Sequence, residues 1–214
     1  MKSIQVYADV WCPFAHVGLR CVVDRRTQVG REDVALDIRA WPLELVNGTP
    51  LDPNMTARHV RDLQTQVAPG QFTHFDPEHF PTTSLPALAC IHAAYRKDLK
   101  TGEAVSFALR NALFEDGLDI SDQDVLSEVS NAHGVGPSNA EDERSIVSDW
   151  QEGVQRGVKG SPHFFCGGHN VFCPSLDISK DGGGHMDVKT NLDDLDAFLR
   201  ECFDGWALAL DRTT

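Results

Sequence analysis

The first forty residues alternate between two hydrophobic periods. Apolar side chains at every second position over residues 3–10 predict a β-strand. The period then changes to that of a helix, which begins at residue 13 and ends at Gly30. Alternation returns over residues 34–40 and predicts a second strand. Because a helix connects the two strands, they should lie parallel in a βαβ unit.

Helical periodicity dominates the middle of the chain, and this stretch shows no strand pattern. Ser84 and Ser121 supply cap signals for two of the helices. The helical segments expected here cover residues 55–67, 84–100, 103–117, 121–135 and 138–158. The whole stretch of residues 48–157 is therefore predicted to be an all-helical domain.

Strand signals return after residue 160. Two short apolar runs flank Gly167-Gly168 and predict a hairpin. The glycine-rich residues 174–190 are expected to form a loop, and residues 190–203 a final helix. The order is βαβ, a helical block, then ββα. It predicts an α/β, thioredoxin-like fold built from residues 1–47 and 158–214, with residues 48–157 as an inserted helical domain.

Charge and hydropathy narrow the possible partners. The chain has 32 acidic and 19 basic residues, for a net charge of −13, which argues against nucleic acids and anionic membranes. No segment reaches the ~18 apolar residues of a membrane span. Gln5 and Asp9 interrupt the apolar pattern of the amino terminus, which argues against a signal peptide. We therefore expect a cytoplasmic protein whose six cysteines are reduced.

Cys12 and Pro13 stand where the first strand gives way to the helix. Free N–H groups and partial positive charge at a helix start stabilise a thiolate and lower the thiol pKa. His16 lies four residues further on, on the same face, and would add positive charge when protonated. Asp9, just before, could relay protons or cap the helix start. From Cys-Pro alone, a small buried side chain before a proline turn is an equally good interpretation.

A second motif lies about 150 residues downstream, where Ser161 and Pro162 precede a predicted strand in GVKGSPHFF. Together with DVWCPFAHVGL, it resembles the DsbA family of thioredoxin-fold oxidoreductases, and most closely the FrnE-type branch. WPLEL and LFEDGLDISDQDVLSEVSNAHGV are also similar to segments of that branch. The resemblance covers most of the chain.

The resemblance implies that the Ser161–Pro162 peptide is cis and lies beside Cys12. Pro13, Phe14, Ser161 and Pro162 would then bind the thiol substrate, since an exposed backbone edge can pair with an extended peptide. A small thiol such as glutathione or mycothiol could bind in the same way. The alternative is a trans proline that merely opens a strand.

This sequence departs from the family at Ala15, where a dithiol oxidase carries its second cysteine. Cys21 cannot replace that cysteine, because nine helical residues separate it from Cys12 by ~13 Å, whereas a disulfide allows Cα atoms only ~7 Å apart. Cys166 follows Pro162 by four residues and could approach the site along the sheet. Cys166 and Cys173 are not opposite one another in either expected hairpin register.

The motifs favour a thiol-dependent oxidoreductase that performs thiol–disulfide exchange through Cys12 alone, with His16 tuning it. The relatives of this branch, 2-hydroxychromene-2-carboxylate isomerase and the kappa-class glutathione transferases, suggest small-thiol-dependent isomerisation or conjugation as the alternative. A non-catalytic DsbA-like binding protein is a third interpretation. We expect a thiol or disulfide substrate, no tightly bound cofactor, and a monomer or homodimer. No metal site is expected, although Cys166, His169 and Cys173 approach zinc-ligand spacing.

Overall fold

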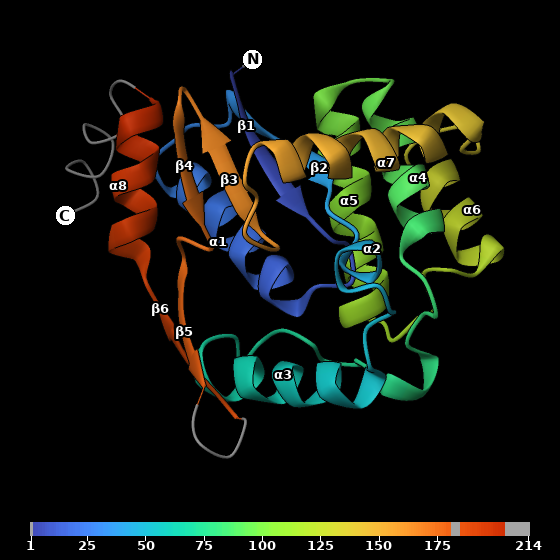
Figure 1. Ribbon diagram of the computed structural model, residues 1–214, viewed down its shortest axis with the longest axis horizontal. Helices are drawn as coiled ribbons and strands as arrows, with labels where there is room; N and C mark the ends of the chain where they lie inside the picture. Colours follow the sequence, from blue (N-terminus) through green and yellow to red (C-terminus); the bar gives the residue numbers. More distant parts are fainter. Residues whose placement is uncertain (1, 181–184, 204–214) are drawn as a thin grey trace.

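The computed structural model describes residues 2–180 and 185–203. Its main sheet has the strand order β2-β1-β3-β4 (Figure 1). The strands are β1 (Lys2–Ala8), β2 (Val34–Ala40), β3 (His163–Cys166) and β4 (His169–Phe172). β1 and β2 are parallel, whereas β3 is antiparallel to both β1 and β4. The predicted parallel βαβ unit and the later hairpin are therefore confirmed.

The described segments contain eight α-helices, six of them between β2 and β3. The two outside this stretch are α1 (Pro13–Gln28) and α8 (Leu192–Cys202). The inserted elements are α2 (Leu43–Asn47), α3 (Pro53–Gln66), the short 3-10 helix η1 (Pro77–His79), α4 (Leu85–Tyr95), α5 (Leu99–Phe114), α6 (Gln123–Ala132) and α7 (Ala140–Gln155). The predicted order of βαβ, helices and a hairpin is present, but α2 was not predicted. The domain boundaries at residues 47/48 and 157/158 stay a prediction.

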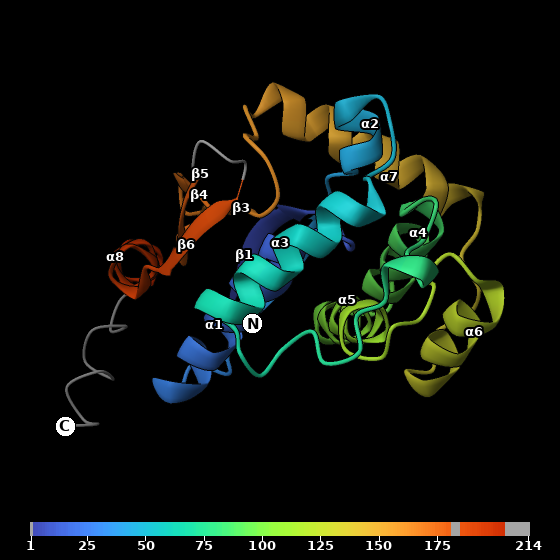
Figure 2. The ribbon, with the colours of Figure 1, turned by 90° about the horizontal axis from the view of Figure 1, so that it is seen from below.

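Helices cover both faces of the sheet. α1 and α8 pack on the face where Ile4, Val6 and Phe164 are fully buried. On the other face, Tyr7 and neighbouring aromatic rings pack against Trp150 of α7, and Figure 1 shows α7 crossing above β1 and β2. In Figure 2, α8 and the group α4, α5 and α6 lie at opposite ends of the molecule, with α3 between them.

The helical block also closes the free edge of β2. An exposed strand edge leaves backbone groups unpaired, but here side chains from α4, α5 and α7 accept the N–H groups of that edge. The bonds run from Leu36 N to Glu103 Oε2 (2.7 Å), from Ile38 N to the Tyr95 hydroxyl (2.9 Å) and from Ala40 N to Asp149 Oδ2 (2.9 Å). The insertion is thus bonded directly to the sheet.

The loop expected over residues 174–190 is wrong for most of its length. β5 (Leu176–Lys180) and β6 (Met186–Thr190) form an antiparallel hairpin instead. Gln66 and Asp62 of α3 hydrogen-bond the backbone of β6, at Met186 and Val188. The local signal was the alternation of Leu176 with Ile178 and of Met186 with Val188, and the contacts with α3, more than a hundred residues away, hold β6 in place. Gly182, Gly183 and Gly184, part of the expected loop, lie outside the described residues.

The β3–β4 hairpin has the register that places Cys166 opposite His169. Cys166 and Cys173 are therefore not opposite one another, as predicted. In the parts of the chain that the structure describes, no helix is both long and apolar enough to cross a membrane.

Candidate active site

Cys12 occupies the junction between β1 and α1. It is the N-cap residue of α1, Pro13 is the first helical residue, and the Cys12 carbonyl accepts the N–H of His16 at 3.0 Å. Proline suits this position because its missing N–H would have no partner there. The side chain of Cys12 is buried, with only 4 % of the residue exposed. The strand-to-helix junction predicted from the sequence is therefore present.

The fold brings Cys12 and the Ser161–Pro162 peptide together. That peptide is cis, and the Cys12 thiol donates a hydrogen bond to the Ser161 carbonyl at 3.3 Å. The Asp9 N–H donates to the Ser161 hydroxyl at 2.9 Å, which joins the end of β1 to the same loop. A Cβ atom on Gly18 would lie 3.3 Å from the ring of Pro162, so a glycine in α1 lets the proline approach closely. Both motifs thus form one site.

Burial controls the protonation of Cys12. Removal from water raises the pKa of the thiol, and the nearby charge of Asp9 raises it further. The hydrogen bond with Ser161, the Ala15 N–H at the helix start and the charge of Arg110 lower it, but they do not outweigh burial. The pKa lies above its usual value, so the predicted thiolate is wrong for the free protein. Cys12 is a protonated thiol at rest.

His16 does not supply the positive charge expected of it. Its ring is fully buried between Phe72 and Phe114, with ring centroids 5.1 and 4.8 Å away. Burial lowers the pKa of His16 to about 4, although its 2.8 Å hydrogen bond to Glu115 opposes this. The imidazole is neutral at neutral pH and anchors α1 to the end of α5.

Arg110 is the cation that the sequence interpretation missed. It is fully buried in α5, and its guanidinium donates to the carbonyls of Asp9 at 2.8 Å and Val10 at 3.3 Å. Burial lowers the pKa of Arg110 to about 10, against the attraction of Cys12 and Asp9, so it stays charged at neutral pH. The available signal was an arginine inside the apolar run SFALRNALF.

The pKa of the Asp9 carboxyl lies close to neutral pH. It is fully buried, and burial raises its pKa to about 7 despite hydrogen bonds and the charge of Arg110. Its Oδ2 atom accepts the N–H of Leu43 at 2.5 Å. Asp9 therefore caps α2 and not the start of α1, because its side chain points toward the helix that follows β2.

Phe14 connects α1 to α3. Its ring lies 5.4 Å from the ring of His59, and the residue is half-buried, whereas its neighbour Pro13 is buried. These two residues therefore lie beside Cys12 at the start of α1. Their expected role in binding a thiol stays a prediction.

Cys173 is a second neighbour of the site that sequence reasoning missed. Its N–H donates to the Pro162 carbonyl at 3.0 Å, and its φ is +48°. Burial, followed by the charges of Cys12 and Cys21, raises the pKa of Cys173 to about 12. The sequence signal for this contact was the hairpin register. Continued by one residue beyond His163 and Phe172, it places residue 173 opposite residue 162.

Cys166, by contrast, does not approach Cys12. β3 is antiparallel to β1, with His163 opposite Tyr7 and Phe165 opposite Gln5. Cys166 therefore lies toward the beginning of β1, whereas Cys12 follows its end. Within residues 2–180 and 185–203, no group of three or more His, Cys, Asp or Glu side chains could hold a metal ion.

The chain is similar in sequence and in fold to known proteins. The sequence profile of the DSBA-like thioredoxin domain matches residues 3–180, whereas no curated protein matches the chain. A Nitrosomonas europaea protein, provisionally described as a protein disulfide isomerase, has a TM-score of 0.62 at 15 % identity and is covered fully, as is this chain (100 % of each).

Two further solved structures share the fold. Cytosolic disulfide reductase DsbM from Pseudomonas aeruginosa, solved with GSH, has a TM-score of 0.59 at 17 % identity, over 93 % of this chain and 98 % of that one. A 2-hydroxychromene-2-carboxylate isomerase has a TM-score of 0.59 at 18 % identity, over 79 % and 88 %.

At these identities the solved structures establish the fold, and the profile match across most of the chain establishes the family. The predicted α/β thioredoxin-like fold with inserted helices is confirmed. This chain belongs to the family of DSBA-like thioredoxin domains.

Proposed function

We propose that the protein is a DsbA-like thiol–disulfide oxidoreductase whose active site uses one redox thiol, Cys12, and a small thiol, glutathione or mycothiol, as co-substrate. The observation that carries this proposal is the 3.3 Å contact between the Cys12 thiol and the carbonyl of the cis Ser161–Pro162 peptide. An extended thiol that pairs with this backbone would bring its sulfur to Cys12.

Because position 15 carries no second cysteine, two molecules of the small thiol are needed to complete the reaction. The Cys12 thiolate attacks one sulfur of a disulfide, forms a mixed disulfide and releases the other half as a thiolate. A small thiol then attacks the mixed disulfide, releases the bound group and leaves its own half on Cys12. A second small thiol frees Cys12 as the small-molecule disulfide leaves. One substrate disulfide is reduced to two thiols, and two small thiols are oxidised to one disulfide.

Charged groups around Cys12 support the proton transfer that this reaction needs. A bound substrate would displace the hydrogen bond between the Cys12 thiol and the Ser161 carbonyl. Asp9, whose pKa of about 7 suits proton exchange near neutrality, accepts the thiol proton in this proposal. The buried guanidinium of Arg110 stabilises the resulting thiolate. His16 acts as a positioning residue, since its neutral ring holds α1 against α5.

In this proposal, the residues around the cis peptide bind the small thiol. Ser161 offers backbone groups, while Pro13, Phe14 and Pro162 supply apolar contact beside Cys12. The similarity to DsbM, whose structure was solved with GSH, supports glutathione as the first thiol to test. We further propose that the protein acts in the cytoplasm, as a monomer or a homodimer.

A second candidate, glutathione-dependent isomerisation or conjugation, is favoured by the protonated state of Cys12. Burial raises the pKa of this thiol, and a protonated thiol can donate a hydrogen bond to a bound glutathione thiolate. The fold shared with 2-hydroxychromene-2-carboxylate isomerase is in keeping with this role. In that case Cys12 would never become covalently modified.

A mass measurement separates the candidates. The reduced protein is incubated with glutathione disulfide, and we expect one glutathione adduct, located at Cys12. Cys12→Ser should remove the adduct and reduce glutathione-dependent disulfide reduction, followed by coupled NADPH oxidation, to the uncatalysed rate. Cys21→Ser is the matched control, because it removes another thiol of α1 and should leave both signals intact.

Other outcomes identify the competing roles. An adduct at a different cysteine, with turnover retained in Cys12→Ser, would refute the single-thiol proposal. Glutathione binding without any adduct, together with glutathione-dependent double-bond isomerisation, would establish the second candidate. No adduct, no turnover and slow alkylation of Cys12 by iodoacetamide would leave a binding protein.

A further inference from the structure

Cys166 and Cys202 meet at the end of the main sheet opposite the proposed active site. Cys166 ends β3, and Cys202 ends α8, 36 residues later. The Cys202 thiol donates to the Cys166 carbonyl oxygen at 3.9 Å, which brings the two cysteines side by side. Both residues are partly exposed, whereas Cys12, Cys90 and Cys173 are buried.

The surroundings of this pair distinguish its two sulfurs. The hydrogen bond from Cys202 lowers the pKa of Cys166, and the positive charge of Lys2 lowers it further, although partial burial opposes both. The same hydrogen bond raises the pKa of Cys202. Cys166 is therefore the thiol of the pair that ionises more readily, whereas the Cys202 thiol donates its hydrogen to the Cys166 carbonyl.

We propose that Cys166 and Cys202 form a second redox site, which a low-molecular-weight disulfide oxidises to an intramolecular disulfide. The Cys166 thiolate attacks one sulfur of the small disulfide and releases the other half as a thiolate. Cys202 then loses its proton to solvent and attacks the Cys166 sulfur, which releases the second half. The protein loses two hydrogens, and one small disulfide becomes two thiols.

This site is separate from Cys12 and does not rest on the proposed function. Cys12 follows the end of β1, whereas the antiparallel register of β3 carries Cys166 toward the start of β1. The new bond would join the hairpin to α8, which lies beside β4 (Figure 1). His169 of the hairpin and Glu201 of α8 already form an ion pair at 3.2 Å, so the two elements are held together before oxidation.

The test uses the full chain carrying Cys12→Ser, so that the proposed active site cannot contribute. The reduced protein is treated with glutathione disulfide, free thiols are blocked with N-ethylmaleimide, and the protein is digested without reductant. Mass spectrometry should find the peptides of Cys166 and Cys202 joined, lighter by two hydrogens than the separate reduced peptides. Reduction before blocking should abolish the joined species.

Three further variants in the same background test the order of attack. Cys202→Ser should trap Cys166 as a mixed disulfide with glutathione, because the resolving thiol is gone. Cys166→Ser should leave Cys202 unmodified. Cys90→Ser is the control, since its thiol is buried against Ser130 in the helical block, and this variant should still form the cross-link.

Recovery of Cys166 and Cys202 as separate maleimide adducts after oxidation would overturn the proposal and leave a packing contact only. A cross-link from either residue to a different cysteine would overturn it as well. Far-UV circular dichroism of each variant verifies that the chain is folded, so that unfolded material cannot produce a false cross-link.

Discussion

Burial sets the protonation of the individual residues around Cys12 more strongly than their charged neighbours do. It raises the pKa of the Cys12 thiol, raises that of Asp9 to about 7 and lowers that of His16 to about 4. In each case removal from water favours the neutral form. Arg110 stays charged because its intrinsic pKa is high enough to survive the same effect. The site therefore holds one buried cation among neutral or nearly neutral groups.

Replacing Asp9 with Asn should flatten the pH dependence of stability. The pKa of Asp9 rises from 3.8 to about 7 on folding, so between these values the folded state binds more protons than the unfolded state. Stability must fall as the pH rises through this window. Relative to Asp9→Asn, the wild-type free energy of unfolding should drop by up to about 4 kcal/mol between pH ~4 and ~7.5. Urea unfolding at several pH values measures the difference.

The pKa shift of His16 changes stability with pH in the opposite direction. His16 is present in both the wild type and Asp9→Asn. Its pKa falls from 6.5 to about 4 on folding, so its contribution grows as the pH rises from ~4 to ~6.5. The difference between wild type and Asp9→Asn isolates the carboxyl, and Asn keeps an oxygen for the Leu43 N–H. If the free energies of unfolding of the two proteins changed in parallel with pH, folding would not raise the pKa of Asp9.

At the scale of elements, close contacts between side chains and backbone fix how the helical block meets the sheet. Tyr95 of α4 is the central contact, since its hydroxyl donates to the Leu36 carbonyl at 2.8 Å and accepts the Ile38 N–H at 2.9 Å. Gly102 of α5 lies directly against the same ring. A ring held at its hydroxyl end cannot move aside easily.

Gly102→Ala should therefore destabilise the protein even though alanine favours helices. A Cβ atom at residue 102 would lie 2.2 Å from the Tyr95 ring, which forces either the ring or α5 to shift. We expect a loss of about 1–3 kcal/mol from overpacking, more than the ~1 kcal/mol that helix propensity returns. Chemical denaturation monitored by circular dichroism measures the change.

Gly136→Ala is the matched control for this variant. No atom lies within 4 Å of a Cβ added at residue 136, so stability should stay the same or rise slightly. Equal stability of Gly102→Ala and the control would mean that the contact between α4 and α5 is loose, and that the closure of the β2 edge does not depend on it.

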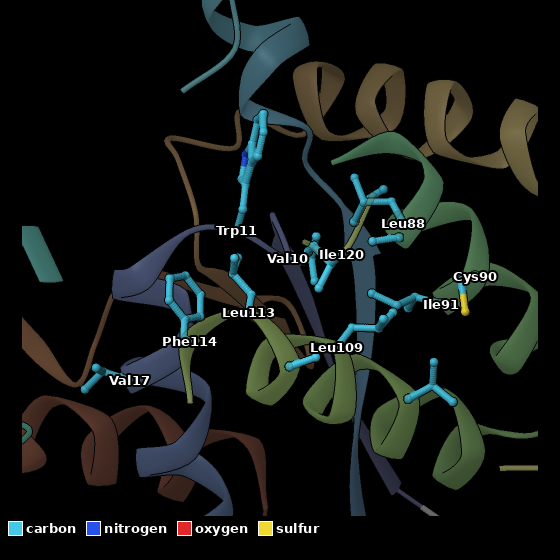
Figure 3. Close-up of a cluster of buried hydrophobic side chains, with 14 of the residues drawn as sticks. Val10, Trp11, Val17, Leu88, Cys90, Ile91, Leu109, Leu113, Phe114 and Ile120 are labelled. Atoms are coloured by element: carbon cyan, nitrogen blue, oxygen red, sulfur yellow. The ribbon is translucent and has the colours of Figure 1, made fainter. Parts of the chain in front are cut away.

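Across the whole molecule, the largest buried apolar cluster of the described residues includes side chains from both parts predicted as domains. Val10 and Trp11, which follow β1, belong to the same buried cluster as Leu109 of α5 and Leu88 of α4. Figure 3 shows Val10 near Leu88 and Leu109, whereas the Trp11 ring points away from them. The cluster also includes Val188 of β6. The core therefore continues from the inserted helices into the thioredoxin-like part.

A shared core predicts that the protein unfolds in one cooperative transition. In a Trp150→Phe, Trp206→Phe variant, which keeps Trp11 and Trp41, tryptophan fluorescence and far-UV circular dichroism, which reports mainly on the helices, should give the same midpoint. Leu109→Ala should shift both midpoints together, with a loss of about 2–5 kcal/mol for a buried leucine. A helical signal lost before the fluorescence signal would show that residues 48–157 unfold on their own.

Local patterns were sufficient for most of the elements and for the two motifs of the site. Strand and helix periods depend on neighbours in the chain, so the βαβ unit, the inserted helices and the β3–β4 hairpin could all be predicted. Cys12 and Pro162 were paired through a family resemblance, and the structure shows them in one site. The β5–β6 hairpin was missed, because the glycine-rich segment favoured a loop over the short alternation of Leu176 with Ile178 and of Met186 with Val188.

Burial and long-range contact, by contrast, emerged only from the packed molecule. Whether His16 is charged, whether Cys12 is a thiolate, and which arginine faces the site depend on residues about a hundred positions away. The same holds for Cys166 and Cys202, which meet because a strand and a helix pack together. A pKa responds to everything within a few ångströms, and neighbours in space are not recorded in the spacing of a sequence.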